Sequence, residues 1–431
     1  MKTPVANADE TPPRTEEDPI ATANRILTKD AKSDPAVAKK LILAHLQEPE
    51  YTARDAEIRD SVWKIMDLME QLAKKFFKFP FPETSANMSK LRTMFRSLAP
   101  ETVKIIGSVA SGGPGGDNAW YEFFTEEQKR RALVIAIIGN VVVEQVFEHH
   151  FFGGGKEAKG ELTETQKKYR KDDGFVRNTK YAEIISRYLR AVDDPKTTKP
   201  NSLPLPADFH RYTQHIALAI YTHLSPILSL HWKMPSSSRS RSSSSSSPPL
   251  EYQTLLKDLY TLTTRAGALS IQMRIDPHTA YHFTPMFKED RFLPKFADCF
   301  NISRLQAAHP RNPAKVWPDN FSEQEIRKRK LDDAVICVTM MSGVTAYRKG
   351  GWEAKDSRVG LVRYEGKDGT EKGLRSRCLT QGWVYVRWGR GRKWEKGVEV
   401  TKKEDYGMLW DGGFVEFRDL VERCKKGKGR A

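Results

Sequence analysis

Apolar residues recur at helical spacing through much of the first 330 residues of the chain. One set repeats every three or four positions with charged residues between, which predicts an amphipathic helix opened by Thr52: Ile58, Val62, Ile65, Met69 and Leu72. The segment from Glu126 to His149 is hydrophobic on most of its circumference, so we expect it to be the central core helix. A further helix is expected from Leu250 to about Met273.

Polar residues suggest where some of these helices begin. Thr125 with Gln128 has the spacing of a capping box in front of the core helix. Ser322 with Glu325 has the same spacing in front of a short helix with a basic end. Both pairs therefore predict a helix start.

The pattern changes to that of strands after Leu331. Four short segments are rich in β-branched and aromatic residues: 334–345, 359–364, 374–379 and 383–388. Lys367-Asp368-Gly369 is a hairpin-turn signal, and a last helix is expected from Phe414 to Cys424. The predicted fold class is therefore mainly α: a helical bundle or array with a small antiparallel β-sheet unit near the C-terminus.

Composition divides the chain further. Residues 1–18 are polar and acidic, and we expect a disordered tail there. Serine runs interrupted by Arg239 and Arg241 predict a disordered, phosphorylatable linker. The expected organisation is a helical domain in two parts (19–234 and 250–330), a Ser/Arg/Pro-rich linker (235–249), a β unit with its closing helix (331–425) and a basic tail (426–431).

The formal net charge is +16, and the basic excess lies in the middle and C-terminal parts of the chain. Such an excess attracts polyanions, although scattered Lys and Arg usually solvate helix faces. The four cysteines, Cys299, Cys337, Cys378 and Cys424, stand far apart, which is typical of neither a disulfide framework nor a zinc site. With an N-terminus unlike a signal peptide, these features predict reduced, mostly buried thiols and a cytoplasmic or nuclear location.

Two apolar stretches have to be weighed as membrane spans. Ala132–Phe147 contains Asn140 and Glu144, and its uninterrupted apolar part is about half of the ~20 residues that a bilayer needs. Ile216–Trp232 is interrupted by polar residues and Pro226. We interpret both as core helices and expect no membrane partner.

Motifs for cofactors, metals and catalysis are weak in this sequence. Gly153-Gly154-Gly155-Lys156 lacks the Ser or Thr of a phosphate loop and follows an apolar helix, so it is interpreted as a helix terminator. His278 and His282 have a zinc-like spacing, but prolines flank them and no third ligand is evident. No nucleophile elbow or dinucleotide fingerprint is found. We therefore predict no cofactor, no metal and no catalytic residue.

The least ordinary segment runs from Trp383 to Trp394, where aromatic and basic residues are interleaved. Single-stranded nucleic acid is often held by aromatic rings that stack on bases and cations that contact phosphates. The candidate nucleic-acid-binding residues are Trp383, Tyr385, Arg387, Trp388, Arg390, Arg392 and Lys393. The favoured interpretation is more ordinary: a strand whose aromatic rings pack on the helical body while its arginines face water.

Four segments carry a resemblance: "RALVIAIIGNVVVEQVF", "DPHTAYHFTPMFKED", "VTAYRKGGWE" and "GLRSRCLTQGWVYVRWGR". Together they resemble a group of uncharacterised proteins of filamentous fungi that combine a helical body, a Ser/Pro-rich insertion and a C-terminal strand segment. The resemblance covers most of residues 120–400. It implies a fungal cytoplasmic or nuclear protein and no site residues.

These observations favour an intracellular interaction or regulatory protein without catalysis, acting on an unknown protein partner. Nucleic-acid binding through the basic, aromatic C-terminal half is the alternative. An enzyme of unfamiliar type is a weaker alternative. It stays open because catalytic sites can assemble from residues scattered along a chain.

Overall fold

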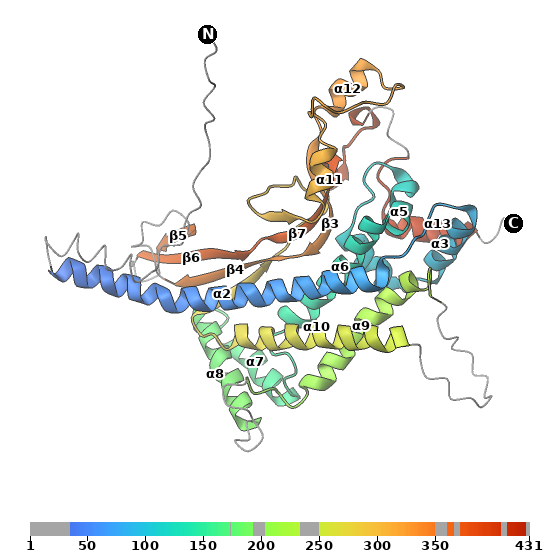
Figure 1. Cartoon of the computed structure of the whole chain (residues 1–431). Helices are drawn as coiled ribbons and strands as arrows, with labels where there is room; N and C mark the ends of the chain where they lie inside the picture. Colours follow the sequence, from blue (N-terminus) through green and yellow to red (C-terminus); the bar gives the residue numbers. More distant parts are fainter. Residues whose placement is uncertain are drawn as a thin grey trace, which may run out of the picture. The chain divides into compact units, whose positions relative to one another are not determined.

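The computed structural model (Figure 1) describes residues 35–172, 174–192, 203–232, 250–349, 360–365, 371–406 and 412–427. The chain forms two compact units, Met1–Glu57 and Ile58–Ala431. The described part of the first unit is the beginning of helix α2 (Pro35–Phe77). In the second unit, the other helices and all described strands belong to one compact body.

Four sequence predictions concern residues outside the described ranges. They are the disordered tail (1–18), the serine-rich linker (235–249), the hairpin turn Lys367–Gly369 and most of the basic tail (426–431). These remain predictions.

The described residues of the chain are mainly helical, as predicted. After α2 come α3 (Ser85–Ser97), α4 (Pro100–Val109), α5 (Gly116–Thr125), α6 (Glu127–Val142), α7 (Lys156–Lys168), α8 (Gly174–Val192), α9 (Phe209–Leu228), α10 (Leu250–Arg274), α11 (Ile302–Ala307), α12 (Glu323–Arg329) and α13 (Phe417–Lys426). A π-helical turn, η1 (Val143–Phe147), continues α6, and a 3₁₀ turn, η2 (Lys403–Asp405), precedes α13.

The strands form small sheets. They are β1 (Thr279–Thr284), β2 (Ala297–Cys299), β3 (Asp333–Met341), β4 (Gly343–Lys349), β5 (Gly360–Glu365), β6 (Glu371–Thr380), β7 (Gly382–Gly389), β8 (Trp394–Glu395) and β9 (Val398–Glu399). Their orders are β1-β4-β6-β5, β2-β7-β3 and β8-β9. Pairing is antiparallel except between β2 and β7. Because β1 and β2 belong to these sheets, the strand-rich part begins before Leu331.

One predicted strand, 334–345, is divided in the structure. Its residues belong to β3 and β4, which lie in different sheets and are separated by Ser342. The division falls where the backbone of Gly343 approaches residues 380–382 so closely that a Cβ atom would lie 2.9 Å from the Thr380 carbonyl oxygen. The single long strand was therefore a wrong prediction, because a close backbone crossing turns the chain from one sheet into the next.

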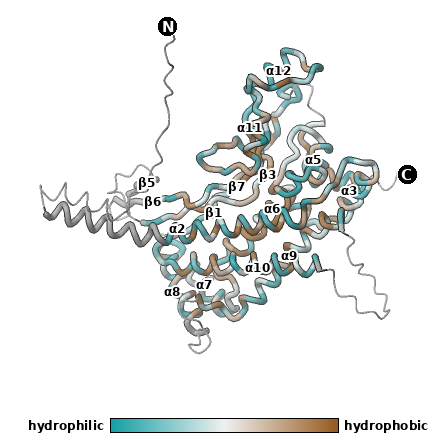
Figure 2. Tube along the Cα trace, in the orientation of Figure 1, coloured by the Kyte–Doolittle hydropathy of each residue, from teal (hydrophilic) through white to brown (hydrophobic). Residues whose placement is uncertain are grey.

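Helix α6 is the core helix that its hydrophobic pattern predicts. Its residues from Ala132 to Ile138 are fully buried, and Figure 2 shows the hydrophobic run along the helix. Strand β3 packs directly on it. At Gly139 a Cβ atom would lie only 2.0 Å from the Met340 carbonyl oxygen, so only glycine lets the strand backbone come this close.

The ends of the core helix differ from the prediction. Thr125 does not cap α6, because it is the last residue of α5 and its hydroxyl donates to the Tyr121 carbonyl oxygen at 3.3 Å. At the other end the helix widens into η1, and the Ser270 hydroxyl and Arg274 guanidinium of α10 donate to the Val146 and Phe147 carbonyl oxygens, both at 2.9 Å. Tertiary neighbours thus take over hydrogen bonds that a regular helix end leaves unmade.

Two other helix boundaries are set by local sequence. The capping box of Ser322 and Glu325 at α12 is confirmed. Helix α7 begins at Lys156, immediately after the triple glycine, and ends before α8 starts. The glycines therefore separate η1 from α7.

Arg130 is a fully buried cation at the start of α6. Its guanidinium donates to three backbone carbonyl oxygens, those of Phe77 at 3.1 Å, Phe124 at 2.5 Å and Phe79. Burial lowers its pKa to about 10. The side chain holds the end of α2 against the α5–α6 junction, so the polar group in the core is structural.

No helix among the described residues is long and apolar enough to cross a membrane. The prediction that Ala132–Phe147 and Ile216–Trp232 are not spans agrees with this finding.

Candidate interaction surface

Strand β7 holds the aromatic residues of the predicted nucleic-acid interface. It is the middle strand of β2-β7-β3, so neighbours cover both of its edges. Trp383 and Tyr385 are buried in the main core. On the other face Trp388 packs on a small second core with Val384 and Val386, and its indole nitrogen donates to the Leu305 carbonyl oxygen at 2.7 Å. The alternation expected for this strand is present, and both of its faces are packed.

The basic residues of the same segment lie in ion pairs. Arg387 bonds Glu289 at 2.6 Å, and Arg390 bonds Asp405 at 3.3 Å. Arg392 pairs with Glu399 at 2.8 Å and also with Glu416. The expectation that these arginines face water is therefore wrong, because acidic side chains of the same chain pair with them.

Lys393 differs from these arginines. Its side chain is exposed, and within the described residues it makes no ion pair. Only its backbone is held, since its amide donates to the Thr401 hydroxyl at 2.6 Å. Among the predicted site residues, Lys393 is therefore the one whose exposed cationic side chain forms no ion pair with another described residue.

Glu289 is the centre of this charged cluster. Its side chain is only 8% exposed, and one carboxylate oxygen accepts hydrogen bonds from the Arg387 guanidinium and the Arg392 amide. The Tyr406 hydroxyl donates to the Arg390 carbonyl oxygen at 2.6 Å, and burial raises the pKa of Tyr406. The cluster thus fastens the glycine-containing segment after β7 to the body, which is a structural role.

The segment that contributes Glu289 also carries three exposed large apolar side chains. We call residues 286–296 the aromatic loop. Phe287 is 61% exposed, Leu293 46% and Phe296 53%. Met286 and Phe292 of the same loop turn inward and pack on the second core. Exposed apolar side chains gathered on one short segment are typical of interaction sites.

The middle of the aromatic loop is fixed by strand β3. The Glu289 amide donates to the Ile336 carbonyl oxygen, and the Phe292 amide donates to the Ala334 carbonyl oxygen, both at 2.8 Å. The Ile336 amide donates back to the Asp290 carbonyl oxygen at 2.9 Å. The loop therefore continues the sheet edge and is not free to collapse onto its own apolar side chains.

The tip of the loop, Leu293–Phe296, is held by side-chain and backbone bonds. The Gln381 amide nitrogen donates to the carbonyl oxygens of Pro294 at 2.8 Å and Lys295 at 3.0 Å. The Gly382 amide donates to the Phe296 carbonyl oxygen at 3.0 Å. Leu293 and Phe296 are thus presented on a turn whose backbone is already ordered, which lowers the entropy cost of binding.

Charge surrounds these apolar side chains. Lys295 is exposed and lies over the Phe296 ring, 5.5 Å from its centroid. Arg291 is 69% exposed and only 3.7 Å from Asp333, whereas Lys288 bonds Glu416. The outward side of the loop therefore combines apolar contact area with accessible positive charge.

The sequence predictions did not include this surface among the candidate sites. The available signal was the alternation of phenylalanine with lysine and arginine from Phe287 to Phe296. That alternation does not reveal which ring turns inward, because Phe292 and Phe296 stand in similar sequence surroundings. The pairing with β3 decides it.

The described cysteine and histidine side chains do not indicate a catalytic or metal site. Burial raises the pKa of the Cys299 and Cys337 thiols to about 11, so neither is an activated nucleophile. His278 precedes β1 and His282 lies within it, so they do not share a helix face. Among the described residues, no group of three or more His, Cys, Asp or Glu side chains is arranged to hold a metal ion.

Comparison with known proteins gave no match. No family model matches the chain, and no match to it was found among curated proteins or solved structures.

Proposed function

We propose that this protein is a non-catalytic interaction protein that binds an apolar segment carrying acidic side chains on a partner protein. The observation that supports this is the turn Leu293–Phe296, which presents two exposed apolar side chains on a backbone fastened by Gln381 and Gly382. Preorganised apolar anchors contribute most to binding when no ordering cost is left.

The chemistry of the partner follows from charge complementarity. Lys295 and Arg291 flank the apolar tip with exposed cations. Acidic groups on the partner would speed association and fix its orientation, while the apolar contacts would supply affinity. An uncharged or basic apolar segment would lack this complementarity.

A peptide-display selection against the full-length chain tests the proposal. We expect enriched peptides to combine large apolar residues with Asp or Glu and to lose at least about tenfold in affinity for the L293S/F296S variant. The control is V316S/L331S, which removes two exposed apolar side chains outside the loop. Enrichment without acidic residues, or equal binding to the wild type and L293S/F296S, would contradict the proposal.

A second candidate is binding of single-stranded nucleic acid through the basic C-terminal part. It is favoured by the β8–β9 hairpin, where Trp394 is 55% exposed and follows the exposed Lys393. One aromatic ring with an adjacent cation is the minimum arrangement for stacking on a base while contacting a phosphate.

Fluorescence anisotropy with a labelled single-stranded oligonucleotide tests this second candidate. Affinity should fall steeply as the salt concentration rises and should drop in K393S/W394A. Absence of binding at low ionic strength would rule it out, and unchanged binding by the variant would exclude this hairpin.

A further inference from the structure

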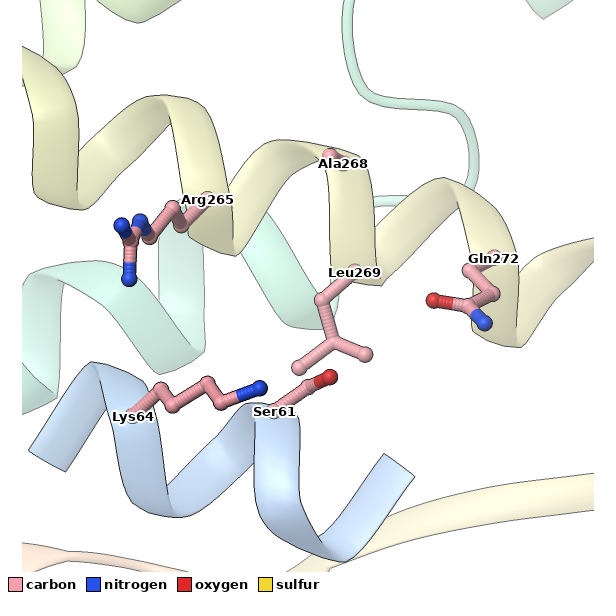
Figure 3. A pocket seen from close by; sticks show the side chains of 6 residues that line it. All are labelled: Ser61, Lys64, Arg265, Ala268, Leu269 and Gln272. Carbon is pink, nitrogen blue, oxygen red and sulfur yellow. The ribbon is translucent and has the colours of Figure 1, made fainter. Parts of the chain in front are cut away.

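A groove lies between α2 and α10, and its lining residues belong to neither the aromatic loop nor the β7 segment. Its volume is about 450 Å³. Ser61 and Lys64 of α2 line one side, and the other is lined by Arg265, Ala268, Leu269 and Gln272 of α10. Figure 3 shows Lys64 and Arg265 reaching into the space between the helices, with Leu269 forming an apolar part of the wall. This volume is within the range of small-molecule sites.

The two cations of the groove are not neutralised by neighbouring acids. Among the described residues, neither Lys64 nor Arg265 has an acidic side chain within 4.0 Å. The nearby acidic residues are engaged elsewhere: Asp60 pairs with Arg59, Asp67 accepts from Gln71, and Asp258 pairs with Lys75. Among the described residues, these two exposed like charges therefore face one groove without a direct ion pair, an arrangement that a bound anion stabilises.

We propose that this groove binds a small organic phosphate. The Arg265 guanidinium and the Lys64 ammonium would bond the phosphate oxygens, which such groups hold with charge-assisted hydrogen bonds. The Ser61 hydroxyl supplies a further donor, and Leu269 with Ala268 contacts the apolar part of the ligand. The site is independent of the protein-binding surface proposed above.

The test uses phenyl phosphate and the full-length chain, with binding followed by broadening of the ligand's ³¹P resonance. We expect saturable binding that weakens at least about tenfold in K64Q/R265Q, since both charge-assisted contacts are lost. The control K90Q/K104Q removes the same net charge at exposed lysines on α3 and α4. It should bind like the wild type.

A second variant tests the shape of the site without changing its charge. A268L extends a half-buried side chain into the groove and keeps a good helix former, so it should weaken binding while α10 stays folded. Equal binding by K64Q/R265Q and K90Q/K104Q would overturn the site. Inorganic phosphate binding as tightly as phenyl phosphate would overturn the requirement for an organic group.

Discussion

The β7 segment and the aromatic loop both interleave aromatic and basic residues, yet they differ in how far these side chains are buried. In the first, Trp383 and Tyr385 are buried and Arg387 is neutralised by Glu289. In the second, Leu293 and Phe296 remain exposed beside the exposed Lys295. Similar composition therefore produced a structural element in one place and an interaction surface in the other.

The difference comes from how many neighbours each segment has. Strand β7 is paired on both edges and packed on both faces, so every ring on it finds a partner. The aromatic loop pairs with β3 along one edge, and at its tip Gln381 and Gly382 hold the backbone while the Leu293 and Phe296 side chains stay exposed. Aromatic-basic composition thus indicates surface area that needs a partner, and the topology determines whether that partner is inside the same chain.

The largest effect is expected from breaking the buried pair at the end of β7. Arg387→Met leaves the Glu289 carboxylate, at 8% exposure, without its cationic partner, and we expect the free energy of unfolding to fall by about 3 kcal/mol. Urea denaturation measures this. The matched change Arg291→Met, at an arginine that is 69% exposed, should cost less than about 0.5 kcal/mol.

A double variant separates charge burial from packing. In E289Q/R387M no buried carboxylate is left, so stability should partly recover relative to R387M alone. If R387M and R291M were equally stable, the contrast between the paired and the exposed arginines would be lost.

A smaller effect is expected at the tip of the aromatic loop. Gln381→Ala removes two hydrogen bonds to the turn, and we expect about 1 kcal/mol less protection of its backbone. Hydrogen exchange of residues 293–297, followed by mass spectrometry, should become faster, while the rest of the chain exchanges as before. Gln306→Ala on α11 is the control, and unchanged exchange in Q381A would show that Gln381 does not hold the turn.

The smallest effect is a pH dependence that ties the two regions together. Glu416 bonds both Lys288 of the loop and Arg392 after β7. Burial raises its pKa, but the two cations outweigh burial and lower it overall below the ordinary value of a glutamate side chain. A carboxyl group whose pKa is lower in the folded state stabilises the fold at pH values above its unfolded-state pKa. This stabilisation is lost as the pH falls through the folded-state pKa.

Chemical denaturation between pH 6 and acid pH measures this contribution. Glu416→Gln should flatten the loss of stability on acidification, and Lys288→Met should reduce it by raising the pKa of Glu416. If E416Q followed the same pH profile as the wild type, the ion pairs of Glu416 would make no measurable contribution to the free energy of unfolding.

Some features were fixed by local pattern alone. The periodicity of α6 predicted the central core helix, and α10 (Leu250–Arg274) lies within one residue of its expected bounds. The capping box at Ser322 was right because Ser322 stands outside any preceding helix, whereas Thr125 belongs to α5 and bonds to its own helix. Periodicity and isolated caps are properties of neighbouring residues, so they can be recognised without the fold.

Other features depend on contacts between residues far apart in the sequence. The sequence alone determined a mainly helical chain with strands near its C-terminus and a basic, aromatic segment at 383–394. Only the tertiary structure decided that Glu289 would neutralise Arg387, that β3 and β4 would part at Ser342, and that Phe296 rather than Phe292 would face outward. The physical reason is that burial and charge pairing depend on which distant segments become neighbours. Local periodicity does not show which segments these are.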